Sequence, residues 1–253
     1  MNFRILGSTL PLLELQLQPN ESVVAVSGEL SWMSRSIVMR TTSQTAGSGG
    51  LFGVLKRVAG GGSIFMTEYT AQNEVGMVAF ATKVPGHILP VEVTSGKEYL
   101  IHRHGFLCAT TGAQLSLGFQ QSLGAGIFGG EGFILQRLGG TCEAWIELDG
   151  EVVPYDLAAG ETLRVHPGHV GMFEASVNFG ITRVPGIKNL LFGGDGIFLS
   201  ELTGPGKIWL QSLPLSNLAH ALSPYLRNPG ETVAASGTGA VIGSALKGLF
   251  DNR

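Results

Sequence analysis

Apolar and polar residues alternate with a period of two along much of the chain. Three such stretches lie at 13–18, 89–94 and 153–158, and each runs through a short turn into another, at 19–25, 95–101 and 159–165. Side chains on a strand point alternately to opposite faces, so this pattern predicts strands with one face on a core. The expected core-facing residues are Leu13, Leu15, Leu17, Leu89, Val91, Val93, Val153, Tyr155 and Leu157.

The spacing of these stretches indicates internal repetition. Val93 follows Leu17 by 76 residues, and Leu157 follows Val93 by 64. Glycine-rich copies of a second motif lie at 60–64, 128–133 and 192–197. The last two of these copies, taken from Gly130 to Gly194, are also 64 residues apart. Two independent sets of anchors thus predict a repeated unit, with room for about four to six short antiparallel strands in each copy.

The repeats divide the chain into four predicted parts. We expect a first β repeat at 1–88, a second at 89–152 and a third at 153–212. Alternation stops after Pro214, and apolar residues then recur at helical spacing from Leu218 to Leu226, which predicts a short helix at 215–226. The part at 213–253 is therefore expected to hold this helix and a flexible tail.

Composition narrows the classes of function. Charged residues make up 14% of the chain, against about 25% in typical soluble domains, so apolar surface is expected to be buried between units or between chains. A net charge of −3 argues against a nucleic-acid partner. The sequence has no run long enough for a membrane span and no signal peptide, so we expect a cytoplasmic protein.

Several residues that can carry chemistry have plain structural interpretations. Cys108 and Cys142 show neither a C-x-x-C nor a metal spacing, and we expect buried free thiols. Trp32, Trp145 and Trp209 are expected to be core or interface anchors. The chain contains no phosphate-binding P-loop and no G-x-S-x-G nucleophile elbow.

The sharpest candidate for a metal site is His102-Arg-His104, five residues after Gly96. The spacing resembles the start of the first cupin motif, but the glutamate expected about four residues later is missing. His166 and His169 approximate the second motif with the wrong spacing. Metal sites need three or four converging ligands. We therefore expect solvent-facing or interface histidines, with no metal or other cofactor.

Glu131 and Asp195 follow paired glycines at equivalent positions of the glycine-rich motif. A general acid and base would need both carboxyls in one cleft. Turn residues need no partner, because each caps backbone N–H groups in its own bend. A repeated structural element repeats its turn chemistry, so the turn interpretation is favoured.

Seven short motifs, in order, resemble the AIM-type mitochondrial biogenesis family, whose bacterial members are largely uncharacterised. They are Glu29–Met33, Pro85–Leu89, Phe106–Ala109, Gly129–Phe133, Gly160–Leu163, Phe192–Gly196 and Gly204–Gln211. The resemblance implies a fold like that of the tryptophan-RNA-binding attenuation protein (TRAP), an all-β fold of three TRAP-like β-sandwich repeats around a pseudo-threefold axis, whose chains can gather into rings. It implies no catalytic set, and a shared fold does not imply RNA binding.

The favoured hypothesis is a non-catalytic scaffold or interaction protein that forms a homo-oligomer, most simply a trimer. An alternative is a cupin-like metal-dependent enzyme or sensor that uses His102 and His104. A second alternative is an RNA-binding ring. Membrane association through the C-terminal tail is not favoured, because Lys247 and Arg253 alone supply basic charge to its apolar stripe.

Overall fold

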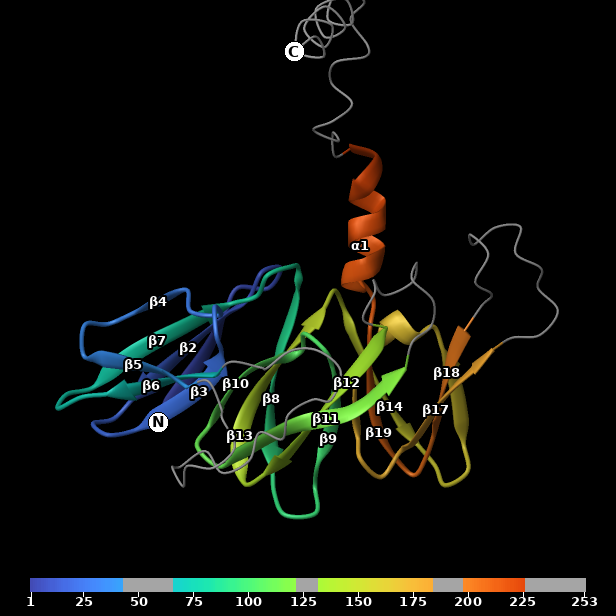
Figure 1. Cartoon of the computed structure of the whole chain (residues 1–253), viewed down its shortest axis with the longest axis horizontal. Helices are drawn as coiled ribbons and strands as arrows, with labels where there is room; N and C mark the ends of the chain where they lie inside the picture. Colours follow the sequence, from blue (N-terminus) through green and yellow to red (C-terminus); the bar gives the residue numbers. More distant parts are fainter. Residues whose placement is uncertain (43–65, 122–131, 184–197, 226–253) are drawn as a thin grey trace, which may run out of the picture. The chain divides into compact units, whose positions relative to one another are not determined.

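A computed structural model describes residues 1–42, 66–121, 132–183 and 198–225. The fold is all-β, with a short helix near the C-terminus, as predicted (Figure 1). The chain divides into two compact units, Met1–Leu215 and Ser216–Arg253. The first unit contains all the described strands.

The described strands are short and follow one another closely along the chain. They are β1 (Asn2–Leu6), β2 (Leu12–Leu17), β3 (Ser22–Val26), β4 (Trp32–Met33), β5 (Ile37–Thr42), β6 (Met66–Ala71), β7 (Gly76–Ala81), β8 (Gly86–Val93), β9 (Tyr99–His102), β10 (Phe106–Thr110), β11 (Ala113–Gln121), β12 (Phe133–Gly140), β13 (Cys142–Asp149), β14 (Val152–Leu157), β15 (Thr162–Val165), β16 (Val170–Glu174), β17 (Asn178–Arg183), β18 (Phe198–Thr203) and β19 (Gly206–Gln211). A 3-10 turn, η1 (Pro167–His169), precedes β16.

Strand pairing follows one scheme in three successive groups of six strands. We call β2–β7, β8–β13 and β14–β19 the first, second and third six-strand sets. In each set the sixth strand lies between the first and the third, and the fifth lies between the second and the fourth. Every pairing is antiparallel. Each set therefore contributes two three-stranded half-sheets, and β1 extends one of them in the first set.

Neighbouring sets are joined by backbone hydrogen bonding between strands. The third strand of one set pairs with the second strand of the set before it. This places β10 against β3 (Figure 1) and β16 against β9. In register, Cys108 lies opposite Ala25, and Met172 lies opposite Ile101. The result is two six-stranded sheets, each made of half-sheets from two sets.

The apolar cores follow the same sharing. The cluster built mainly from the first set also includes Leu107 and Trp145 of the second set. The cluster built mainly from the third set includes Leu100 and Leu135 of the second. Trp145 is fully buried, and its ring contacts Phe3 edge-on, with centroids 5.4 Å apart. Neighbouring sets thus complete each other's cores, as expected when both faces of a sheet are covered.

The turn between the first and second strands has the same backbone conformation in all three sets. Asn20, Gly96 and Gly160 occupy it with φ of 68°, 86° and 81°. Glycine adopts positive φ without a steric penalty, and asparagine is among the few other residues that tolerate it.

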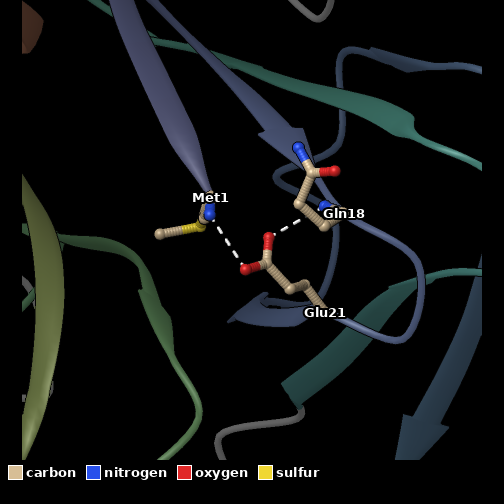
Figure 2. A network of polar contacts seen from close by, with 3 residues as sticks. All are labelled: Met1, Gln18 and Glu21. Carbon is tan, nitrogen blue, oxygen red and sulfur yellow. Dashed lines mark hydrogen bonds and ion pairs between the residues drawn. The ribbon is translucent and has the colours of Figure 1, made fainter.

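In the first set a carboxylate ties this turn to the strand before it. Glu21 accepts the backbone N–H of Gln18 at 2.8 Å and contacts the amino group of Met1, also at 2.8 Å. Figure 2 shows both contacts. The amino group lowers the pKa of Glu21 through this hydrogen bond. In the third set Glu161 accepts the backbone N–H of Ala158 in the same way, at 2.9 Å.

The predicted strands are present, but the predicted core-facing side is wrong in one of them. Leu13, Leu15 and Leu17 of β2 are fully buried. In β14, however, Val153 and Tyr155 are 44% and 45% exposed. β14 is the edge strand of its sheet and pairs with β19 alone. The alternation of apolar and polar residues therefore predicted the strand correctly. It did not determine whether other elements cover the strand's apolar face.

The C-terminal helix is confirmed. α1 spans Leu215–Leu222, and a 3-10 turn, η2, continues it over Ser223–Tyr225. Nowhere in the described ranges is a helix long and apolar enough to cross a bilayer.

Other predictions cannot be compared directly with the structure. The glycine-rich motifs at 60–64 and 192–197, and the residues Glu131 and Asp195, lie outside the described residues. The repeat boundaries at 88, 152 and 212 stay predictions; the first would fall inside β8.

The positive-φ turn gives a test of local backbone strain. Gly96→Ala is expected to lower the free energy of unfolding by about 1 kcal/mol, because a Cβ at positive φ is disfavoured although no atom lies within 4 Å of it. Gly96→Asn should lose less, since Asn20 holds the same conformation. Urea denaturation measures both, with Gly180→Ala as the control because Gly180 has open space and no positive φ. Equal losses for Gly96→Ala and the control would contradict the strain argument.

Candidate functional site

Ionisable groups, two of them buried carboxyls, gather where the first and second sets meet. Glu147 and Asp149 lie two residues apart on β13, and each is 4% exposed. Lys83 lies in the loop between β7 and β8 and forms an ion pair with Glu29. We call Glu29, Lys83, Glu147 and Asp149 the acid–lysine cluster. Sequence reasoning missed it, because acidic residues two apart on a strand usually indicate a solvent-facing side, whereas β13 is buried on both faces.

Burial changes the acidity of the two carboxyls on β13. It raises the pKa of Glu147 to about 7, and the charges of Glu29 and Asp149 add to this, while Lys83 opposes it. Burial likewise raises the pKa of Asp149 to about 6, against the backbone N–H of Leu215 and the charge of Lys83. A carboxyl that titrates near neutral pH is suited to general acid–base chemistry. The cluster is therefore the strongest candidate for a reactive site among the described residues.

The residue that matches Glu147 in the third set is Gln211. The match follows from strand register. β13 pairs with β8, and β19 pairs with β14, in the same register when the two pairs are aligned on the tryptophans of β13 and β19. Glu147 and Gln211 each lie two residues after their tryptophan. The Gln211 side-chain oxygen accepts the backbone N–H of Asp149 at 3.0 Å, and its NH₂ group donates to the carbonyl of Gly168, also at 3.0 Å.

Glu147 occupies the corresponding place one set earlier. There the backbone N–H of Lys83, the residue that matches Asp149, acts to lower the pKa of its carboxyl. Gln211 makes its link through an amide, which has no exchangeable acid proton. Glu147 and Gln211 thus occupy matching places beside backbone groups of a neighbouring set.

The predicted histidines show a similar equivalence. His102 donates from Nε2 to the carbonyl oxygen of Glu147 at 3.1 Å, and His169 donates from Nδ1 to that of Gln211 at 2.8 Å. These two carbonyls occupy matching places on β13 and β19. Burial lowers the pKa of His102 to about 4, so its ring is neutral at pH 7. The second and third sets thus each use one histidine ring to bind a carbonyl near the end of the sixth strand.

The two histidines reach these carbonyls from different positions in the sequence. His169 lies 64 residues after Gly105, and a Cβ built on Gly105 would lie 2.7 Å from a ring carbon of His102. Gly105 therefore leaves room for the ring of His102. In the third set, the side chain at the position matching Gly105 is itself the imidazole.

The four predicted histidines do not form one site. His104 is exposed, while the rings of His166 and His169 lie 5.8 Å apart, edge to face, in the third set. Across the ranges that the structure describes, no three side chains of His, Cys, Asp or Glu are placed to hold a metal ion. The donor set that a cupin-like site needs is therefore not assembled in this part of the chain.

The cysteine prediction is confirmed. Cys108 and Cys142 are buried and unpaired. Burial raises the pKa of both thiols, that of Cys142 to about 11, so neither is a reactive thiolate near neutral pH.

The pKa of Glu147 predicts a pH-dependent stability. Its pKa of about 7 in the folded protein lies above the ordinary value of 4.5, so the folded state binds the extra proton between these values. Stability contributed by Glu147 is then complete at pH 4 and falls as the pH rises to about 7. Glu147→Gln should abolish this fall and stabilise the protein by about 3 kcal/mol at pH 8. Urea denaturation at pH 4.5 and pH 8 checks this.

The matched control is Glu92→Gln, which removes an exposed carboxylate from the neighbouring strand β8. It should change the difference between the two pH values little, since exposed charges contribute little. If Glu147→Gln destabilised the protein at pH 8, Glu147 and Gln211 would not be equivalent.

Comparison with known proteins agrees with this fold. An uncharacterised protein of Streptococcus pyogenes serotype M6 is 28% identical over 222 residues, which cover 85% of this chain and 87% of that protein. The crystal structure of another S. pyogenes protein superposes with a TM-score of 0.69 at 24% identity, covering 89% of this chain and 99% of that one. The family model for mitochondrial biogenesis AIM24 matches residues 3–213. The chain therefore belongs to the mitochondrial biogenesis AIM24 family.

Proposed function

We propose that this protein is a non-catalytic scaffold or interaction protein, and that it works as a ring-like homo-oligomer, most simply a trimer. The observation that carries the non-catalytic part is the equivalence of Glu147 and Gln211. The described carboxyl whose pKa lies nearest to neutral occupies the place where, in the third set, an amide binds a backbone N–H of the neighbouring set. The raised pKa of Glu147 follows from the burial of its carboxyl where two sets meet.

The three six-strand sets are interpreted as three TRAP-like repeats; a closed pseudo-threefold arrangement would also pair β15 with β4 within one chain, and the described residues do not show that pairing. The recurring pairing scheme supports the repeats. So do the turn residues Asn20, Gly96 and Gly160, which share one unusual backbone conformation at matching places. A chain made of like units, each pairing with the next, is suited to presenting extended surfaces.

Assembly is supported by the apolar character of the surface. Charged residues are 14% of the chain, and large apolar side chains such as Trp32 and Leu10 are 49% and 57% exposed. Exposed apolar surface marks interaction sites where it forms a contiguous patch. With a net charge of −3, a protein partner suits this surface better than nucleic acid. The proposal places the protein in the cytoplasm and assigns no membrane-binding role to the C-terminal tail.

The assembly can be measured directly. Light scattering coupled to size exclusion at micromolar concentration is expected to give three times the chain mass of 26.6 kDa. A mass of 26.6 kDa at every concentration would overturn the oligomeric scaffold.

Metal content separates the scaffold from a metal-dependent enzyme. Protein purified without chelator or histidine tag should contain no stoichiometric iron, zinc or manganese by elemental analysis, because His102 is engaged with a backbone carbonyl. Stoichiometric metal that disappears in His102→Ala, but not in the control His87→Ala, would contradict the proposal. His87 is a suitable control because it also contacts a backbone carbonyl, that of Gly150.

A further inference from the structure

The strand-pairing scheme is incomplete at each end of the succession of sets. The second strands β3 and β9 pair on both sides, whereas the matching strand β15 pairs with β18 alone. The third strands β10 and β16 pair on both sides, whereas β4 pairs with β7 alone. Within the described residues, one second-strand edge and one third-strand edge thus lack the partner that their counterparts have.

The side chains on β4 show what this missing partner leaves uncovered. Trp32 pairs with the sixth strand at the same place as Cys108 and Met172 do in the later sets. Cys108 and Met172 are fully buried, while Trp32 is 49% exposed. The largest side chain at this position therefore lies in the set that has no preceding set.

The next position on the strand gives the same contrast. Met33 matches Ala109 and Phe173, which are both fully buried. Met33 is 37% exposed. Two successive apolar residues, which point to opposite faces of the half-sheet, are thus uncovered only in the first set.

We call the β10–β3 and β16–β9 pairings the two joints between neighbouring sets. We propose that β15 of one chain pairs with β4 of a second copy, so that such a joint is repeated between chains. This inference rests on the proposed oligomer and names its interface. An edge strand presents unpaired N–H and C=O groups that can accept another strand. Among the described residues, each chain has one free second-strand edge and one free third-strand edge, so copies can pair head to tail. Head-to-tail pairing closes into a ring when the rotation between copies allows it.

The register of this joint follows from the two joints within the chain. Val165 lies five residues after the turn residue Gly160, as Ile101 does after Gly96. Since Ile101 pairs with Met172, Val165 is expected to pair with Trp32 of the second copy. Antiparallel pairing then sets Arg164 opposite Met33 and Leu163 opposite Ser34.

Arg164 distinguishes this joint from the internal ones. Its counterparts Val24 and Leu100 are buried at 4% and 6% exposure. Arg164 is instead exposed, and its guanidinium forms an ion pair with Glu201 at 2.9 Å. The aliphatic stem of arginine can cover an apolar neighbour while its charge stays in water. The charge also protects a lone edge from indiscriminate strand pairing, as suits a joint between separate chains.

Engineered disulfides test the register. Chains carrying Arg164→Cys are co-expressed with chains carrying Met33→Cys, and the oxidised product is resolved by non-reducing electrophoresis. Directly opposed residues in an antiparallel pair lie within disulfide range, so covalent dimers between the two kinds of chain are expected. The native Cys108 and Cys142 are buried and do not compete.

The matched control pairs Arg164→Cys with Arg35→Cys, two residues out of the expected register. Such diagonal neighbours lie about 7–8 Å apart, beyond easy disulfide formation, so at least tenfold less dimer is expected. Equal yields from the two pairs would overturn the register. In a chain carrying both Arg164→Cys and Met33→Cys, a cross-linked monomer would show that β15 and β4 close within one chain, which would also overturn the proposal.

Disruption of β4 separates failure of this interface from failure of the oligomer itself. Trp32→Glu is expected to weaken assembly at least tenfold by light scattering, with the far-ultraviolet circular dichroism of the folded protein retained because Trp32 is outside the core clusters. Tyr155→Glu, at 45% exposure on β14, should leave assembly unchanged. If Trp32→Glu still assembled like the unaltered protein, the β4 interface would be wrong while the oligomer stood. If the unaltered protein were monomeric, both would fall.

Discussion

Backbone hydrogen bonding between neighbouring six-strand sets is the constraint on which the rest of the structure depends. A half-sheet of three strands has two edges, and buried backbone groups at an edge must find partners. Here β10 and β16 supply those partners to β3 and β9, which fuses half-sheets of different sets into common sheets. The shared cores follow, because both faces of a common sheet must then be covered.

The same constraint explains where the ionisable residues lie. Where sixth strands end beside the preceding set, backbone N–H and C=O groups lose their ladder partners and need side-chain substitutes. Gln211 accepts an N–H group there, and His102 and His169 donate to carbonyls, while the backbone N–H of Lys83 lowers the pKa of the Glu147 carboxyl. In the sequence these acidic and imidazole side chains resemble catalytic or metal-binding residues. In the structure they lie against backbone groups.

Sequence predicted the strands and the C-terminal helix well, because alternation and helical spacing are local signals. It could not predict which strand faces are covered, since the exposure of Tyr155 depends on neighbours far away in the chain. The acid–lysine cluster escaped prediction for a related reason. Lys83 and Glu147 are 64 residues apart, and only pairing between sets brings them together. His169 shows a further limit of prediction from repeat spacing. It makes the hydrogen bond that His102 makes in the second set, but the spacing of the repeats aligns it with Gly105.

The difference between Glu147 and Gln211 makes the two internal joints unequal. The joint held by an amide keeps the same hydrogen bonds at any pH, while the joint held by Glu147 must bury a charge once the carboxyl ionises. We therefore expect the first set to be held less tightly than the third in mildly alkaline conditions. Local opening should then begin between β3 and β10, where hydrogen exchange would detect it first.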